Sequence, residues 1–280
     1  MNISDHNDKL RNYLEFRKYS PRSIKSYCSN FAGFLAHFEK QGVTHPDKIN
    51  SEMVIGFLKQ FLEPATHSGY HSAIKIYYEK VALVGIKKFK FIERPKKNKK
   101  LPIILSVAEI QRMFDVCKNL KHKVILSLLY SAGLRVSELI NLKWSHIDRS
   151  RMIINIIAAK GNKDRQVTLA TTIIPLLEKD WKEYKSVNYV LTGQSGHDQY
   201  SSRSVGEVVK QLAEKAGISK RVYTHLMRHC SFTHLVEAGT DINIIQRLAG
   251  HSNVKTTNRY LHISHNHISQ INSPINSIKL

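Results

Sequence analysis

The sequence predicts a mainly α-helical protein with a small β-sheet, divided into two domains. Apolar residues recur at three- and four-residue spacing along most of the 280 residues, which is typical of amphipathic helices. Residues 152–169 differ, because two apolar, β-branched runs flank a short polar turn, as in a hairpin. A basic stretch containing prolines interrupts the helical patterns about a third of the way along the chain, whose length is sufficient for two cores.

Residues 1–92 are expected to form a small helical domain. A helix follows the Ser20-Pro21 start signal, and its apolar face comprises Ile24, Tyr27, Phe31, Phe34, Leu35 and Phe38. Similar patterns cover 53–61 and 70–84. Together they predict a bundle of about four helices.

A basic linker, assigned to residues 93–102, is expected between the domains. The chain carries Lys87, Lys88, Lys90, Arg94, Lys96, Lys97, Lys99 and Lys100 in this region, against Glu93 alone. Pro95 and Pro102 prevent a continuous helix. One interpretation is a solvated tether. We favour a segment that follows DNA phosphates, because such a segment would join two basic domains.

The second domain is expected over residues 103–262. Ser106 and Glu109 have the spacing of a capping box that opens a helix, and Gly133 lies where the next helix would end. After the predicted hairpin, helical patterns cover 172–184, 204–216, 224–238, 242–248 and 254–261. This domain should therefore be rich in helices, with one small sheet.

The charge of the chain points to a polyanionic partner. There are 43 Lys and Arg residues against 22 Asp and Glu, a formal net charge of +21. Nucleic acid is favoured over an anionic membrane, because no basic amphipathic segment dominates the sequence. No apolar run approaches the roughly 18 residues that a membrane span needs. The opening residues do not resemble a secretory signal, so the cytoplasm is the expected location.

Cysteine and histidine usage gives no sign of a metal or a cofactor. Cys28, Cys117 and Cys230 are far apart and odd in number, so reduced, packed thiols are expected. The histidines His262, His265 and His267 have no nearby cysteine or acidic residue to complete a metal site. We therefore expect neither a metal nor a cofactor.

Five short segments of the second domain carry residues that suit chemistry on a phosphodiester. They are Ala132-Gly133-Leu134-Arg135-Val136-Ser137-Glu138-Leu139, Ala159-Lys160-Gly161-Asn162-Lys163, His225-Leu226-Met227-Arg228-His229, Leu248-Ala249-Gly250-His251-Ser252 and Thr256-Thr257-Asn258-Arg259-Tyr260. Each segment alone is a weak signal. In this order and at this spacing they resemble the tyrosine recombinase, or phage integrase, family.

The arginines and histidines of these segments suit the binding of a scissile phosphate. A scissile phosphate gains negative charge as a nucleophile adds, so Arg135 and Arg228 would clamp its oxygens. For Arg135 alone, a surface ion pair with Glu138 is the simpler interpretation. His225 lies three residues before Arg228, so both side chains share a helix face. His251 follows a probable helix stop and would hold the phosphate or exchange a proton.

The resemblance assigns the remaining roles. Tyr260 would be the nucleophile, and its deprotonation should be favoured by the surrounding Arg135, Arg228, His225 and His251. Lys160, in preference to Lys163, would protonate the leaving 5′ oxygen as general acid. Glu138 would support the site. Candidate DNA-contacting residues are Arg22, Lys25, Lys87, Lys88, Lys90, Arg94, Lys96, Lys97 and Lys163.

The sequence departs from the family pattern in a few places. Met227 replaces the usual Leu before the second arginine, and Cys230-Ser231-Phe232 departs from the usual Ser-Phe-Ala type of run. These positions are interpreted as packing positions.

Further implications concern DNA and assembly. The resemblance implies a two-domain clamp on double-stranded DNA, made of a helical core-binding domain and a catalytic domain. The protein would be a monomer in solution and a homo-tetramer on DNA, passing through a Holliday junction. The apolar tail, 263–280, would dock on a neighbouring protomer or fold back on its own domain. Two alternatives are a DNA-binding protein of the same fold that does not cut, and an enzyme like type IB topoisomerases that relaxes DNA.

Overall fold

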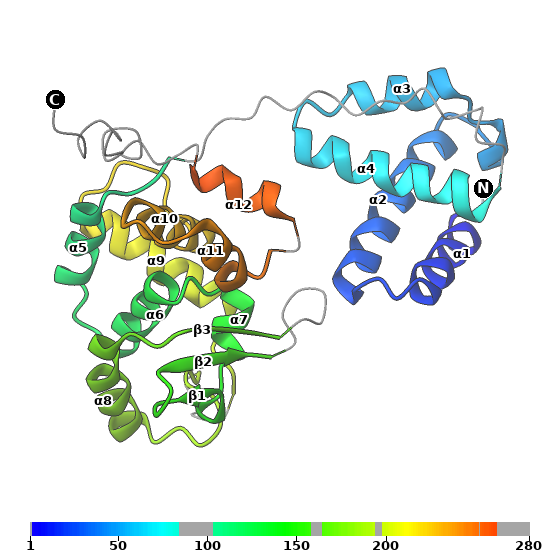
Figure 1. The fold of residues 1–280 in the computed structure, drawn as a ribbon. Coiled ribbons are helices and arrows are strands. Elements are labelled where there is room, and N and C mark those ends of the chain that lie inside the picture. The colour runs from blue at the N-terminus through cyan, green and yellow to red at the C-terminus, as the bar shows by residue number, and fades with distance from the viewer. Residues whose placement is uncertain (1, 84–102, 158–163, 194–197, 252, 262–280) are drawn as a thin grey trace, which may run out of the picture. The chain divides into compact units, whose positions relative to one another are not determined.

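The computed structural model describes residues 2–83, 103–157, 164–193, 198–251 and 253–261. The chain divides into two compact units, Met1–Lys99 and Lys100–Leu280 (Figure 1). Both are described separately below. The predicted linker, 93–102, lies outside the described residues, and the clamp arrangement of the two domains stays a prediction.

The first unit is helical, as predicted. Its elements are α1 (Ile3–Phe16), α2 (Pro21–Glu39), the 3₁₀ turn η1 (Pro46–Lys48), α3 (Ser51–Lys59), α4 (Pro64–Ile76) and the π-helical turn η2 (Tyr77–Val81). The start signal of α2 is confirmed, because the Ser20 side chain accepts a hydrogen bond from the backbone N–H of Ser23. Helix α4 begins at Pro64, earlier than predicted, since proline is tolerated in a first turn.

Aromatic side chains dominate the core of the first unit. The rings of Phe31 and Tyr77 stack with centroids 4.1 Å apart, which joins α2 to the end of the α4 segment. The buried hydroxyl of Tyr78 donates to the backbone carbonyl of Pro46 at 2.9 Å. Arg22 and Lys25 lie on the first two turns of α2 and are exposed.

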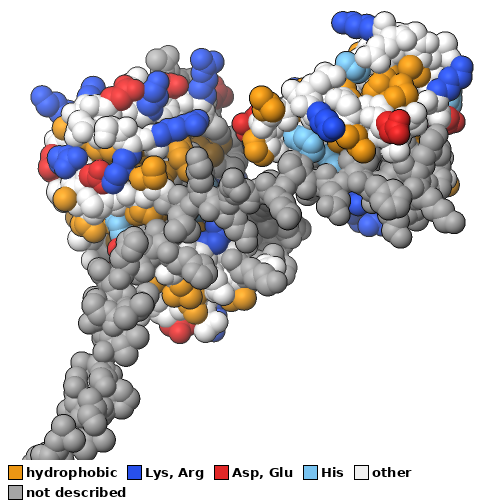
Figure 2. All heavy atoms as spheres, turned by 90° about the horizontal axis from the view of Figure 1, so that it is seen from above, with side chains coloured by type: hydrophobic (Ala, Val, Ile, Leu, Met, Phe, Trp, Pro, Cys, Tyr) orange, Lys and Arg blue, Asp and Glu red, His pale blue; other side chains and the backbone are white. Residues whose placement is uncertain are grey.

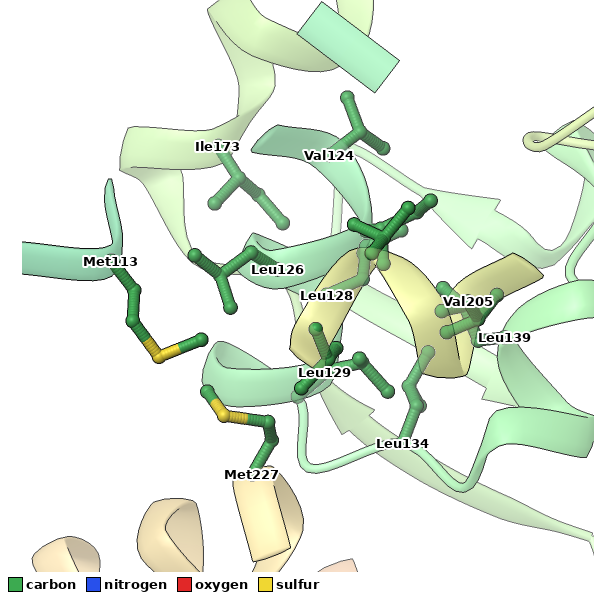
Figure 3. Packing of buried hydrophobic residues seen from close by; sticks show 14 of the residues in the cluster. Met113, Val124, Leu126, Leu128, Leu129, Leu134, Leu139, Ile173, Val205 and Met227 are labelled. Atoms are coloured by element: carbon green, nitrogen blue, oxygen red, sulfur yellow. The ribbon is translucent and has the colours of Figure 1, made fainter. Parts of the chain in front are cut away.

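The second unit surrounds one helix whose residues 124–129 are all buried. Its helices are α5 (Val107–Asp115), α6 (Leu120–Ser131), α7 (Val136–Ile140), α8 (Ile174–Tyr184), α9 (Ser202–Lys215), α10 (Thr224–Glu237), α11 (Ile242–Ala249) and α12 (Val254–Leu261), with 3₁₀ turns at Trp144–His146 and Thr171–Ile173. Helix α6 contributes Val124, Leu126, Leu128 and Leu129 to the core that Figure 3 shows. A helix with six consecutive buried residues must be covered on several sides, and α7, α8, α9 and α10 contact α6.

A three-stranded antiparallel sheet, in the order β1-β2-β3, lies at one edge of this unit (Figure 1). It comprises β1 (Ile147–Asp148), β2 (Ile153–Ile156) and β3 (Arg165–Thr168). The predicted hairpin is confirmed, since β2 pairs with β3 in a register that places Ile156 opposite Arg165. Its turn, 158–163, lies outside the described residues, and β1 was not predicted.

Local end signals position the elements that carry the candidate site. The capping box of Ser106 and Glu109 is confirmed at the start of α5. Gly133 follows α6 with φ +58°, and Gly250 ends α11 with φ +60°, both in the left-handed region that favours glycine. Gly133 therefore turns the chain two residues before Arg135, and Gly250 turns it directly before His251.

The departures from the family pattern lie at packing positions, as predicted. Met227 and Cys230 are buried in the core of the second unit, and Phe232 is buried in a smaller cluster beside it. All three cysteines are free and buried, as expected.

One face of the second unit carries charged side chains of both signs. On the face that Figure 2 shows, Lys and Arg side chains are interspersed with Asp and Glu side chains. No helix in the described part of the chain is both long and apolar enough to cross a membrane.

Candidate active site

Four separate segments bring the candidate residues of the second unit together. Arg135 precedes α7, Arg228 lies on α10, His251 follows α11, and Tyr260 lies on α12. Helices α10, α11 and α12 contact one another (Figure 1). The guanidinium groups of Arg135 and Arg228 both donate to the backbone carbonyl of Ala249, the last residue of α11. The two arginines therefore converge, as predicted.

Arg228 is a buried cation held by carbonyl groups. Its side chain is fully buried, and its Nη1 donates to the carbonyl of Gly133 at 2.6 Å. Its guanidinium carbon lies 4.7 Å from the ring centroid of Phe232. Burial, and then the charge of Arg135, lower the pKa of Arg228 to about 9, so it stays protonated at neutral pH. Its Nε has no hydrogen-bond partner among the described residues.

Glu138 is the anionic centre of the site. Its carboxylate accepts from the backbone N–H of Arg135 at 2.8 Å and from Arg135 Nη1 at 2.7 Å. The simpler interpretation of Arg135, an ion pair with Glu138, is therefore present alongside its convergence with Arg228. Burial disfavours the charged carboxylate, but hydrogen bonds from Arg165 and Arg135 outweigh it and lower the pKa of Glu138 to about 2.

Arg165 joins this group and was missed by the sequence analysis. It lies at the start of β3, and its side chain is 6% exposed. Its Nη1 and Nη2 each donate to one oxygen of Glu138 at 2.7 Å, and its Nε donates to the carbonyl of Leu248 at 2.7 Å. The only sequence signal was its place just after the predicted hairpin turn, which does not distinguish a buried arginine from an exposed one.

The histidines of the site have lowered pKa values. His251 Nδ1 lies 3.0 Å from the hydroxyl oxygen of Thr257, and burial, followed by the charges of Arg228 and Arg135, lowers the pKa of His251 to about 4. His225 lies on α10 with Arg228, as predicted, and burial and Arg228 also lower its pKa. A neutral imidazole is a proton acceptor, so these groups suit proton transfer better than charge neutralisation.

His229 is a second residue that the sequence analysis did not single out as a site residue. Its ring centroid lies 4.6 Å from that of His225 and 5.8 Å from that of Tyr260. Its Nδ1 is buried without a hydrogen-bond partner among the described residues. Burial, and then His225, lower the pKa of His229 to about 4. A second neutral imidazole therefore lies next to Tyr260.

Tyr260 is buried, with 2% of its surface exposed. Its ring packs near Phe232, with centroids 5.6 Å apart, and stacks on His251 at 6.2 Å. The predicted lowering of its pKa is wrong in net direction. Arg228, Arg259 and Arg135 do favour the phenolate, but burial outweighs them and raises the pKa of Tyr260. The expected help of His225 and His251 is missing because neutral rings carry no charge.

The other candidate residues are not brought to this site by the described structure. Lys160 and Lys163 lie outside the described residues, as do Lys87, Lys88, Lys90, Arg94, Lys96 and Lys97. Arg22 and Lys25 belong to the first unit. Within the described segments, no group of three or more His, Cys, Asp or Glu residues could hold a metal ion.

Comparisons with known proteins agree with this arrangement. A model of the "Phage integrase family" matches residues 104–267, and one described as "Phage integrase, N-terminal SAM-like domain" matches residues 7–86. Tyrosine recombinase XerA of Pyrococcus horikoshii is 32% identical over 95% of this chain and 92% of its own. Tyrosine recombinase XerD of Oceanobacillus iheyensis is 31% identical over 89% and 90%.

Solved structures give the same result. The crystal structure of XerA recombinase is 25% identical, with a TM-score of 0.56 over 96% of this chain and 97% of that one. A lambda integrase tetramer bound to a Holliday junction has a TM-score of 0.76 over 92% and 76% of the two chains, at 15% identity, and so shares the fold. With the family model covering more than half of its length, the chain belongs to the phage integrase family of tyrosine recombinases.

Proposed function

We propose that this chain is a site-specific DNA recombinase that cuts and rejoins DNA strands through Tyr260. One observation carries the proposal: Tyr260 on α12 and the buried, protonated Arg228 on α10 both contact the ring of Phe232, and Arg135 binds the same carbonyl as Arg228. The named relatives are tyrosine recombinases, which fits this chemistry.

The proposed reaction needs neither a metal nor a nucleotide. The phenolic oxygen of Tyr260 attacks the scissile phosphorus, and a 3′-phosphotyrosyl bond replaces the bond to the 5′ oxygen, which leaves with a proton. Arg135 and Arg228 stabilise the added negative charge on the non-bridging oxygens. Lys160 supplies the proton to the leaving oxygen. The bond energy is conserved in the ester, so the 5′ hydroxyl of another strand can reverse the reaction.

A neutral histidine is the proposed acceptor for the phenol proton. The raised pKa of Tyr260 keeps the phenol protonated at neutral pH, so its attack on phosphorus requires a proton acceptor. His251 stacks on Tyr260 and is neutral at neutral pH, so one nitrogen of its ring can accept a proton. His225 and His251 would also bind the phosphate.

Assembly is proposed from the same likeness. Four copies would act on two double-stranded DNA sites and pass through a Holliday junction, starting from a monomer in solution. The tail, 263–280, would dock on a neighbouring copy, and the basic residues listed above for DNA contact would follow the phosphates. Because the proposed substrate is genomic or mobile DNA, the proposed location of the protein is the cytoplasm.

Covalent trapping tests the proposal. The protein, its Tyr260→Phe variant and a Tyr200→Phe control are mixed with nicked duplexes from the genomic flanks of its gene, without metal or nucleotide. The nick lets a short fragment escape, so the covalent complex accumulates. Denaturing gels should show a shifted band for the unaltered protein and for the control, in which a partly buried tyrosine of the same unit is changed.

The outcomes separate the alternatives. No shifted band on DNA that all three proteins bind would favour the non-cleaving DNA-binding protein. A shifted band together with relaxation of supercoiled DNA, but without any exchange between two sites, would favour the enzyme like type IB topoisomerases.

A further inference from the structure

We propose that Arg165 is a positioning residue for DNA cleavage, which occupies the Glu138 carboxylate so that Arg135 and Arg228 keep donors for the scissile phosphate. The inference rests on the proposed function and assigns a role to a residue outside the six that would carry the chemistry. It follows from how one buried carboxylate is shared among three guanidinium groups.

Arg165 takes the larger share of that carboxylate. It binds both oxygens of Glu138 with two parallel hydrogen bonds of 2.7 Å, whereas Arg135 places only one guanidinium nitrogen on it. Arg228 stays 4.0 Å away and donates to two backbone carbonyls instead. A bidentate pair is the strongest geometry available to a carboxylate, so Arg165 leaves Arg228 with only a long ion pair to Glu138 and no hydrogen bond to it.

The cluster therefore keeps a surplus of positive charge. Three guanidinium groups face one carboxylate, and the pKa values of about 2 for Glu138 and about 9 for Arg228 keep both groups charged at neutral pH, so the site is cationic there. A phosphate entering the site compensates the surplus. Without Arg165, the buried Glu138 would draw Arg228 towards itself, because an unpaired buried carboxylate is costly.

Arg165 also fixes the backbone on which both catalytic arginines are held. Its Nε donates to the carbonyl of Leu248, and the next carbonyl, of Ala249, accepts from Arg135 and Arg228. A Cβ atom at Gly250 would lie 2.8 Å from Arg165 Cδ, so the arginine passes close over a backbone without a side chain. The end of α11 is thus clamped by the same side chain that holds Glu138.

A kinetic comparison tests this role. Arg165→Lys keeps the charge but cannot form two parallel hydrogen bonds, and Arg165→Gln removes the charge. Arg149→Gln is the matched control, because this arginine of the same unit is 58% exposed in a surface pair with Glu178. DNA affinity is measured in the Tyr260→Phe background, cleavage is measured as the single-turnover rate at saturating DNA, and folding is checked by thermal melting.

We expect both Arg165 variants to bind DNA with parental affinity and to cleave about 10- to 100-fold more slowly, as for a small misplacement of catalytic groups. The Arg149→Gln control should cleave at the parental rate. In the Glu138→Gln background, the further change Arg165→Lys should add little, because the partner through which it acts is already altered. If Arg165→Gln does not fold, Arg165→Lys alone decides.

Failure of the positioning role and failure of the proposed function give different results. If the unaltered chain cleaves and folded Arg165→Lys cleaves as fast, or is defective only in DNA affinity, the positioning role is refuted and the proposed function stands. If the unaltered chain forms no covalent complex on DNA that it binds, the proposed function fails, and the inference fails with it.

Discussion

A buried carboxylate of the second unit should make the protein less stable as the pH rises through about 6. Asp180 lies on α8, is fully buried, and has no hydrogen-bond partner for either oxygen among the described residues. Burial raises its pKa from 3.8 to about 6, although the charge of Lys121 opposes this and that of Glu183 adds to it. We therefore predict that Asp180→Asn stabilises the protein at high pH.

The magnitude follows from proton linkage. The folded protein holds the Asp180 proton more tightly than the unfolded chain does, so its contribution to stability is full below pH 3.8 and is lost as the pH rises through about 6. Each pKa unit corresponds to about 1.4 kcal/mol, so the loss amounts to about 3 kcal/mol. Asparagine resembles the protonated acid, so the variant should gain up to this amount at pH 8 and about nothing at pH 4.

Tryptophan fluorescence during urea unfolding measures this difference in one unit. Both tryptophans, Trp144 and Trp181, belong to the second unit, so their signal does not report the first. Glu178→Gln on the same helix is the control, because its side chain is 45% exposed and a surface pair contributes less than about 1 kcal/mol. Equal stability of Asp180→Asn and parent at pH 8, or a less stable variant, would refute the reasoning.

Three further predictions follow from local geometry. Gly133→Ala should lower the free energy of unfolding by about 2 to 4 kcal/mol, since its Cβ would lie 2.7 Å from Phe232, whereas Gly217→Ala, also left-handed but with open space, should cost only about 1 kcal/mol in the same urea assay. Ser106→Ala removes the N-cap of α5 and should cost about 1 kcal/mol; an unchanged urea midpoint would contradict the capping role. The NMR resonances of the His251 ring should titrate near pH 4, because burial and two arginines disfavour its charge, and a midpoint near 6.5 would show a ring that is hydrated in solution.

The helices and their ends could be predicted where the signal is local. The cap at Ser106, the start at Ser20 and the left-handed glycines Gly133 and Gly250 each depend on residues within one turn, and the structure confirms all four. The start of α4 and the strand β1 were not predicted. Helix α4 begins at Pro64 ahead of its apolar pattern, and the short strand β1 forms only because β2 is available to pair with it.

The candidate site was only partly readable from the chain. The order and spacing of Arg135, His225, Arg228, His251 and Tyr260 indicated the chemistry through their resemblance to the tyrosine recombinase family. Helix spacing alone predicted only that His225 and Arg228 share a face. The ion pair between Glu138 and Arg165 could not be predicted from the sequence. Arg165 lies 27 residues away, and nothing local to either residue encodes a pair that forms only when β3 packs on α11.

The sequence alone determined which groups can react and which backbone turns present them, since these depend on residue chemistry and on neighbours within a few positions. Only the tertiary structure decided their protonation. Burial raises the pKa of Tyr260 against the pull of its arginines, and lowers that of His251 until the ring is neutral. Desolvation depends on every atom that excludes water from a group, and those atoms come from segments that the fold alone brings together.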